Sequence, residues 1–210
     1  MANNLITNDL SSLIQVSRET IESLNEFKRI LLENNKKFNL ISSKDEEIVD
    51  VRHIQDSAQI VDLIDKKSKK CIDLGSGAGL PGIVVAIILR DKKNETRMNL
   101  FEKSHRKSDF LREIKEKLKL DVNVYEKDVF KEKNLNSGSV IVRAFKPLPT
   151  ILEIMEKNFI NFSNLVVFMG KNGKQLVESS IKKWDFDYKK KRSITSKDSF
   201  LINIKNVKKK

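Results

Sequence analysis

A glycine-rich turn between two apolar segments carries the residues that are best suited to chemistry. The turn reads D-L-G-S-G-A-G-L-P-G over 73–82, and the apolar run 83–89 after it predicts a helix. Glycines let a backbone approach a ligand closely and adopt dihedral angles that other residues avoid. The helix N-terminus adds free N–H donors and a partial positive charge. Together these features indicate a binding site for a nucleotide-type cofactor.

Two cofactor motifs overlap in this turn. The segment from Gly77 to Gly82 matches G-x-G-x-x-G, the dinucleotide fingerprint that places a pyrophosphate at a helix N-terminus. The segment from Asp73 to Gly79 matches D-x-G-x-G-x-G, the first motif of class I methyltransferases that use S-adenosylmethionine (SAM). We favour SAM because the carboxylate of Asp73 suits an ammonium group, directly or through water, and would repel a pyrophosphate. The candidate cofactor-binding residues of the turn are Asp73, Gly75, Gly77 and Gly79.

Two later strands supply candidates for binding the nucleoside. A strand is expected over 97–102, and it ends on Glu102, where nucleotide-binding α/β folds hold an acid against the ribose hydroxyls. The next strand, expected over 121–126, leads to Asp128, near the place where SAM enzymes contact adenine. Asp128 is equally well interpreted as a solvated turn residue. An acid at the position of Glu102 fits SAM and NAD alike, so an NAD-binding oxidoreductase stays open as an alternative.

The elements after residue 70 alternate in type. Strands are expected near 70–74, 97–102, 121–126, 139–143 and 164–169, and helices near 81–90, 104–119, 147–159 and 173–182. This alternation predicts an α/β fold with a doubly wound, mostly parallel sheet and right-handed crossovers. The segments 184–191 and 199–205 have no strong helix between them, so they predict an antiparallel hairpin that brings the sheet to about seven strands.

The residues before 67 predict an N-terminal helical extension packed on a SAM-binding core of residues 67–210, within one compact domain. Apolar residues from Leu10 to Leu31 have helical spacing after a cap at Asn8 or Asp9, and a linker is expected over 34–42. A second helix is expected to begin with a capping box, S-K-D-E over 43–46. One face of that helix would be lined by Ile48, Val51, Ile54, Ala58 and Val61.

Composition narrows the class of protein. With 210 residues, 39% of them hydrophobic, the chain can bury one substantial core. The single cysteine, Cys71, excludes a disulfide framework, and we expect it to be an inert buried thiol in the first strand. No apolar run approaches the roughly 20 residues of a membrane span, and the first residues lack the pattern of a secretion signal. We therefore expect a soluble, cytoplasmic protein with no membrane contact.

The net charge of +12 favours a polyanionic partner. Three lysine-rich segments, 66–70, 189–192 and 208–210, would raise nonspecific affinity for RNA. However, lysine greatly outnumbers arginine, and asparagine and isoleucine are abundant, which is typical of an AT-rich genome. Solvated surface is therefore an equally good interpretation of the charge.

Several separated segments carry further motifs. They are N-K-K-F-N-L at 35–40, V-R-H-I-Q-D-S at 51–57, R-K-S-D-F-L-R at 106–112 and R-A-F at 143–145. Together with the glycine turn and its L-P-G extension, they resemble the RsmG (GidB) family of bacterial small-subunit rRNA guanine-N7 methyltransferases. The resemblance covers about residues 25–205. It implies a class I SAM methyltransferase fold and N7-methylation of one guanosine of 16S rRNA, guanosine 527 in the family's usual rRNA numbering.

The resemblance also assigns roles to residues. It puts Gly75 and Leu80 against SAM, and Val129 and Phe130 around its adenine. Arg143 would line both the active site and the SAM pocket, and the motif around Arg52 and His53 resembles the family's substrate-side helix. The candidate catalytic residues are therefore Arg143, Arg52 and His53. Glu102 stands where the family more often has aspartate, and Phe130 stands where an acid is common.

Some of these residues have simpler interpretations. Arg143 could form an ion pair at the end of its strand, and His53 could be a core histidine with satisfied hydrogen bonds. Phe145 could stack on a flipped-out guanine or be a buried aromatic residue. Lys171 lies in M-G-K-N, which replaces the family's commoner L-K-G-Q or L-K-G-R, so no role follows for it.

The motifs that are missing from the sequence agree with N7 chemistry. It has no [N/D/S]-P-P-[Y/F] motif for methylation of an exocyclic amino group, and Cys71 is in the wrong element to attack a pyrimidine carbon. Guanine N7 has an available lone pair, so positioning and electrostatics suffice. We expect a monomer that acts on 16S rRNA or the small ribosomal subunit and uses no metal. The alternatives are a methyltransferase of another RNA or a small molecule, an NAD-binding oxidoreductase, and a non-catalytic rRNA-binding assembly factor.

Overall fold

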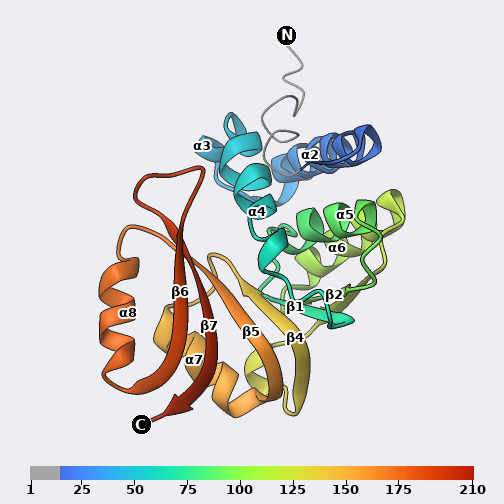
Figure 1. Cartoon of the computed structure of the whole chain (residues 1–210). Helices are drawn as coiled ribbons and strands as arrows, with labels where there is room; N and C mark the ends of the chain where they lie inside the picture. The colour runs from blue at the N-terminus through green and yellow to red at the C-terminus, as the bar shows by residue number, and fades with distance from the viewer. Residues whose placement is uncertain (1–14) are drawn as a thin grey trace.

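A seven-stranded sheet forms the centre of the protein, in the order β3-β2-β1-β4-β5-β7-β6 (Figure 1). The structure is a computed structural model and describes residues 15–210. Strands β1 to β5 run parallel, and β7 is antiparallel to both of its neighbours, β5 and β6. The strands are β1 (Lys70–Leu74), β2 (Arg97–Glu102), β3 (Val122–Glu126), β4 (Leu135–Val142), β5 (Phe159–Met169), β6 (Trp184–Arg192) and β7 (Phe200–Lys209). The expected fold class and the closing hairpin are confirmed.

Helices cover both faces of the sheet because successive strand residues point to opposite sides. Cys71 of β1 packs in the core shared with α5 and α6, whereas Ile72 packs in the core shared with α7. Figure 1 shows α2, α5 and α6 stacked on one side and α7 and α8 on the other. The helices are α2 (Arg18–Phe38), α5 (Gly82–Asp91), α6 (His105–Leu118), α7 (Leu148–Asn158) and α8 (Gly173–Ile181), with a 3-10 turn η3 (Val129–Lys131).

The expected elements after residue 70 are confirmed within a few residues, with two exceptions. β4 and β5 begin at Leu135 and Phe159, earlier than expected, because Leu135 pairs with Phe159 and Ser137 with Phe162. The first halves of β4 and β5 contain several polar residues, and most of the first five residues of β5 are exposed or half-buried. The apolar runs that marked both strands in the sequence cover only their buried second halves.

The first helix differs from expectation at both ends, and at its start residues 15–17 are not helical although a helix was expected from Leu10 onward. α2 begins after Ser17, whose hydroxyl accepts a hydrogen bond from the Thr20 N–H at 3.2 Å. The expected caps, Asn8 and Asp9, lie outside the described residues. The prediction of a linker over 34–42 is wrong for residues 34–38, because α2 continues to Phe38. The buried amide of Asn34 bonds back to the Ile30 carbonyl at 3.0 Å, and Asn39 ends the helix with φ 50°.

The second helix is not continuous, so the expectation of one apolar face is wrong. The segment divides into α3 (Ser43–Glu46), a π-helix η1 (Asp50–Gln55), α4 (Asp56–Ala58) and a 3-10 turn η2 (Val61–Leu63). A π-turn adds a residue to each turn and so rotates everything after it. Ile48, in the break before the π-helix, is 49% exposed and Val51 is 44% exposed, whereas Ile54 is buried. The N-cap of α3 is Ser42 without a side-chain cap bond, so the expected capping box from Ser43 does not form.

Residues on both sides of position 67 share one core. Leu24 and Phe27 of α2 belong to the same buried cluster as Ile83 and Ile87 of α5. The division into an extension of residues 1–66 and a core of residues 67–210 stays a prediction. Among residues 15–210, no helix is both long and apolar enough to cross a membrane.

Candidate active site

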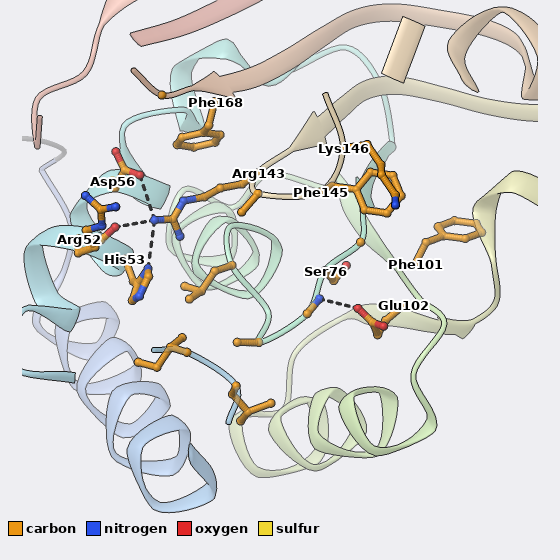
Figure 2. A pocket seen from close by; sticks show the side chains of 18 of the residues that line it. Arg52, His53, Asp56, Ser76, Phe101, Glu102, Arg143, Phe145, Lys146 and Phe168 are labelled. Atoms are coloured by element: carbon orange, nitrogen blue, oxygen red, sulfur yellow. Dashed lines mark hydrogen bonds and ion pairs between the residues drawn. The ribbon is translucent and has the colours of Figure 1, made fainter. Parts of the chain in front are cut away.

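A cavity of about 670 Å³ opens at the carboxyl ends of the parallel strands, where α/β folds bind ligands. The glycine turn after β1 lines one half, together with the ends of β2 and β3. The π-helix, the end of β4 and the β6–β7 loop (residues 193–199) line the other half. Figure 2 shows Glu102 and Phe101 at one side of this space and Arg52, His53 and Asp56 at the other, with Arg143 reaching toward them.

The glycine turn has the backbone geometry that its sequence predicts. Gly75, Gly77 and Gly79 have φ of 72°, 54° and 83°, a region that favours glycine. The N–H groups of Gly75 and Ser76 donate to the Phe101 carbonyl at 2.9 and 3.0 Å. A Cβ on Gly77 would meet nothing closer than 3.7 Å, so the space above this residue is open to a ligand. Gly79 instead packs against Ile83 and does not line the cavity.

Asp73 lies behind the turn rather than on the cavity wall. Its side chain is almost fully buried, and Oδ2 accepts the Gly82 N–H at 3.1 Å. A Cβ on Gly82 would come within 2.5 Å of the same oxygen, which explains a glycine at that position. Oδ1 is buried with no partner among the described residues. Burial raises the pKa of Asp73 to about 7. Asp73 is not among the residues that line the cavity, and its contact with the SAM ammonium stays a prediction.

Glu102 connects the end of β2 to the glycine turn. Its Oε2 accepts the Gly77 N–H at 3.0 Å, and its Oε1 accepts the Ser104 N–H at 2.8 Å (Figure 2). These bonds fix the carboxylate on the cavity wall. Each oxygen keeps a second lone pair that can accept from a ribose hydroxyl. The longer side chain thus fits the predicted role, which remains a prediction.

The four residues after β3, 127–130, all line the cavity, and the last three are the predicted adenine contacts. Asp128 caps η3 by accepting the Phe130 N–H at 3.2 Å, Val129 is buried, and Phe130 is 44% exposed. The amide of Asn158 donates to the Val129 carbonyl at 2.8 Å and holds this segment in place. Their predicted contacts with adenine require an exposed ring and a backbone fixed near the cavity, and both are present.

Arg143 is the best-connected cation of the cavity. Its Nη2 donates to the Arg52 carbonyl at 2.6 Å and to His53 Nδ1 at 3.1 Å, and it lies 3.2 Å from Asp56 Oδ2 (Figure 2). The guanidinium also lies 5.6 Å from the centre of the Phe168 ring. Burial lowers the pKa of Arg143 below its ordinary value, while the charge of Asp56 opposes that shift.

A left-handed residue separates Arg143 from Phe145. Ala144 has φ 49°, which is uncommon outside glycine and is found where a site needs a fixed backbone. The Phe145 ring covers Gly75 so closely that a Cβ on Gly75 would lie 2.3 Å from the ring. The ring centres of Phe145 and Phe130 are 6.1 Å apart. The R-A-F motif thus turns its cation toward one half of the cavity and its ring toward the other.

His53 is neutral in this environment. Burial and the neighbouring Arg143 charge lower its pKa to about 4. Because Nδ1 accepts from Arg143, the proton of the neutral ring is on Nε2, which lies 3.7 Å from Asp45 Oδ2 and has no hydrogen bond among the described residues. The Arg52 side chain is 57% exposed and lies 3.5 Å from Asp45 Oδ1. The three candidate catalytic residues are therefore brought together around Arg143.

Several residues of this site had no role predicted from the sequence. Asp56 stands in the V-R-H-I-Q-D-S motif, and its spacing to His53 was a usable signal. Phe168, Ser193 and Thr195 line the cavity from β5 and the β6–β7 loop, and no motif marks them. Lys171 is exposed and is not part of the cavity wall. Cys71 is fully buried and burial raises the pKa of its thiol well above the ordinary value, which confirms an inert cysteine.

The fold and the site define the class I SAM-dependent methyltransferases: a parallel sheet closed by an antiparallel hairpin, a glycine turn after β1, and an acid at the end of β2. Residues 20–202 match the GidB family, rRNA small subunit methyltransferase G, and the chain belongs to that family. SAM is therefore its cofactor, and the NAD alternative is set aside.

Two relatives carry the name ribosomal RNA small subunit methyltransferase G. The protein from Pelagibacter ubique is 48% identical over 197 residues, which cover 93% of this chain and 92% of the relative. The protein from Ruegeria sp. is 34% identical over 92% of this chain and 94% of its own. The fold is similar to an O-methyltransferase from Bacillus cereus in complex with SAH, with a TM-score of 0.60, 14% identity and coverage of 94% and 95% of the two chains.

Proposed function

We propose that this small-subunit rRNA methyltransferase transfers a methyl group from SAM to N7 of one guanosine of 16S rRNA, the guanosine numbered 527 in the family. One observation carries the proposal: Arg143 lies between the cofactor half of the cavity and the polar half, and the His53 and Asp56 side chains beside it are already bonded to it. N7-methylation requires a positioned nucleophile and no proton acceptor.

The residues of the polar half suit that chemistry. SAM supplies an electrophilic methyl group when it is bound. The N7 lone pair forms the new N–C bond as the C–S bond breaks, its electron pair goes to sulfur, and no proton moves. Arg143 is a cation, and His53 has a pKa of about 4 with its Nδ1 already bonded to Arg143. Neither is a proton acceptor near neutral pH. Their role is to hold RNA phosphate or the guanine O6 edge, for which a planar guanidinium is well suited.

Four lysines line the mouth of the cavity and support an RNA substrate. They are Lys103, Lys107, Lys127 and Lys146. Lys127 pairs with Glu132 at 2.9 Å, and no ion pair forms at the other three within residues 15–210. Phosphate contacts of this kind position an RNA without reading its sequence. We propose a monomer that acts in the cytoplasm on 16S rRNA or on the small ribosomal subunit.

The test is nucleoside analysis of small-subunit rRNA after reaction with purified protein and radiolabelled SAM. Naked 16S rRNA and assembled subunits are offered in parallel, both from cells that lack the gene. We expect the label in 7-methylguanosine at a single position. Label in another nucleoside would overturn the N7 assignment, and the absence of transfer to either substrate would favour a non-catalytic assembly factor.

A further inference from the structure

Asp56 connects Arg143 to a loop far away in the sequence. Its Oδ1 accepts from Gln59 Nε2 at 2.7 Å, from Thr195 Oγ1 at 2.7 Å and from Ser193 Oγ at 3.2 Å. Its Oδ2 lies 3.2 Å from Arg143 Nη2, and the two side chains of this ion pair are only 14% and 13% exposed. One carboxylate thus holds the guanidinium with one oxygen and the β6–β7 loop with the other.

Further bonds attach the same loop to the helical segment. Gln59 Oε1 accepts the Ile194 N–H at 3.2 Å, and Lys191 Nζ donates to the Gln59 carbonyl at 3.3 Å. Ser193 and Thr195 also line the cavity. The loop therefore forms a wall of the site, and Asp56 is the only described side chain that bonds both this wall and Arg143.

The negative charge of Asp56 helps to fix the position of the Arg143 guanidinium. Three acceptors converge on Nη2, whereas Nε and Nη1 have no hydrogen-bond partner within residues 15–210. Those two nitrogens are free to donate to an RNA group. A buried guanidinium that loses its carboxylate partner turns toward water, because an unpaired buried charge is costly.

We propose that Asp56 is a positioning residue for methyl transfer, which aims Arg143 at the RNA while the β6–β7 loop is seated against its other oxygen. The proposal rests on the proposed role of Arg143 in holding the substrate. It makes the loop part of the catalytic apparatus: a loop that leaves Asp56 releases Arg143 as well.

Substitutions at both ends of this connection test the proposal. Asp56→Asn keeps the shape but removes the charge, and we expect kcat to fall by about a hundredfold with the Kd for SAM unchanged. Ser193→Ala with Thr195→Val should lower kcat by about tenfold, because two hydroxyl bonds are lost far from the RNA-facing nitrogens. The matched control is Asp198→Asn, an exposed carboxylate of the same loop outside the cavity, which should keep wild-type activity.

Two readouts separate positioning from a merely structural role. If Asp56 acts through Arg143, adding Asp56→Asn to Arg143→Lys causes no further loss of kcat. The chain has only two histidines, so ¹⁵N NMR with a His105→Asn reference resolves the His53 ring. We expect the wild-type ring to carry its proton on Nε2, and the Nδ1 signal to shift in Asp56→Asn and in the loop variant as Arg143 leaves.

The outcomes are distinct. Wild-type kcat or an unshifted His53 signal in Asp56→Asn, beside an inactive Arg143→Lys, overturns this inference and leaves the proposed function intact. Wild-type kcat in Arg143→Lys overturns the proposed role of Arg143. If Asp56→Asn does not fold, the loop variant decides, because it keeps the Asp56 carboxylate and removes only the two hydroxyl groups that bond to it.

Discussion

At the scale of single residues, burial sets the charge of two groups beside the cavity. Asp73 has its pKa raised to about 7, and His53 has its pKa lowered to about 4, in each case mainly by removal from water. Both shifts favour the neutral form. The cofactor half thus contains a carboxyl group that gains its charge near neutral pH, and the polar half contains an imidazole that stays neutral there.

The pKa of Asp73 has a consequence for stability. The native carboxyl binds a proton that the unfolded one, with a pKa of about 3.9, has released, so the stabilisation is full below about pH 4 and is lost as the pH rises through 7. Asp73→Asn should remove this part of the pH dependence of the free energy of unfolding. Urea unfolding from pH 4 to 8 measures it, with Asp198→Asn as the control. If the free energies of unfolding of Asp73→Asn and wild type differ by the same amount at every pH in that range, the raised pKa of Asp73 is contradicted.

Glu102 provides a second residue-scale prediction. Glu102→Ala removes the acceptor that holds the Gly77 N–H and the group expected to bind the ribose. We expect SAM affinity to fall by about 1–3 kcal/mol, measured by calorimetry or by the thermal shift that SAM induces. Glu95→Ala changes an exposed acid whose one ion pair within residues 15–210 is with Lys69, and it should keep wild-type affinity. Equal affinities of the two variants would remove Glu102 from the cofactor site.

At the scale of elements, the π-helix decides which residues reach the cavity. A regular helix over 43–61 would bury Ile48 and Val51 on the same face as Ile54. In the interrupted segment the first two are exposed, and the π-turn directs His53, Asp56 and the Arg52 carbonyl toward Arg143. Such turns are frequent at functional sites because they re-aim side chains within a helix.

Measurements of stability can test which residues of segment 43–61 are buried. Val51→Gln and Ile48→Gln should each change the free energy of unfolding by less than about 0.5 kcal/mol, because both side chains are largely exposed. Ile54→Ala should cost about 2–5 kcal/mol, because it removes a fully buried side chain. Denaturant titration compares the three. A large loss in both glutamine variants would indicate a continuous helix.

Most of the fold could be predicted from the sequence because local patterns encode it. The strands β1 and β2 are mostly apolar, and α6 and α7 have apolar residues at helical spacing, so boundaries such as those of β1 and β2 matched. The π-helix could not be predicted, because its apolar residues also fit a regular helix. The contact of Asp56 with Ser193 and Thr195 joins residues more than a hundred positions apart, and no local pattern encodes such a pair.

At the scale of the whole molecule, the positive charge is divided between the two ends of the sheet. The lysines at the cavity mouth lie at the carboxyl ends of the parallel strands. Segment 66–70 leads into the start of β1, and 208–210 contains the end of β7, which pairs with the start of β6. Figure 1 shows the C-terminus at the opposite end of the sheet from α3. Of the three lysine-rich segments, only 189–192 ends beside the cavity.

This division predicts unequal effects on RNA binding. Changing Lys103, Lys107 and Lys146 to alanine together should lower the slope of log K against log salt by about 2, because phosphates near a bound guanosine lie at the mouth. Removing Lys208, Lys209 and Lys210 should change the slope much less. Filter binding across a salt series compares the two variants. The reverse order would place the RNA path along the hairpin.

The hairpin has one more consequence, for how copies of the protein behave toward one another. β6 is the last strand of the sheet, so one of its edges presents backbone N–H and C=O groups to solvent. Exposed side chains from Lys189 to Arg192 cover the second half of that edge. A second copy that approached edge to edge would bring two cationic rows together. We therefore expect these cations to oppose edge-to-edge pairing of copies, and we expect that repulsion to weaken when salt or a free polyanion neutralises them.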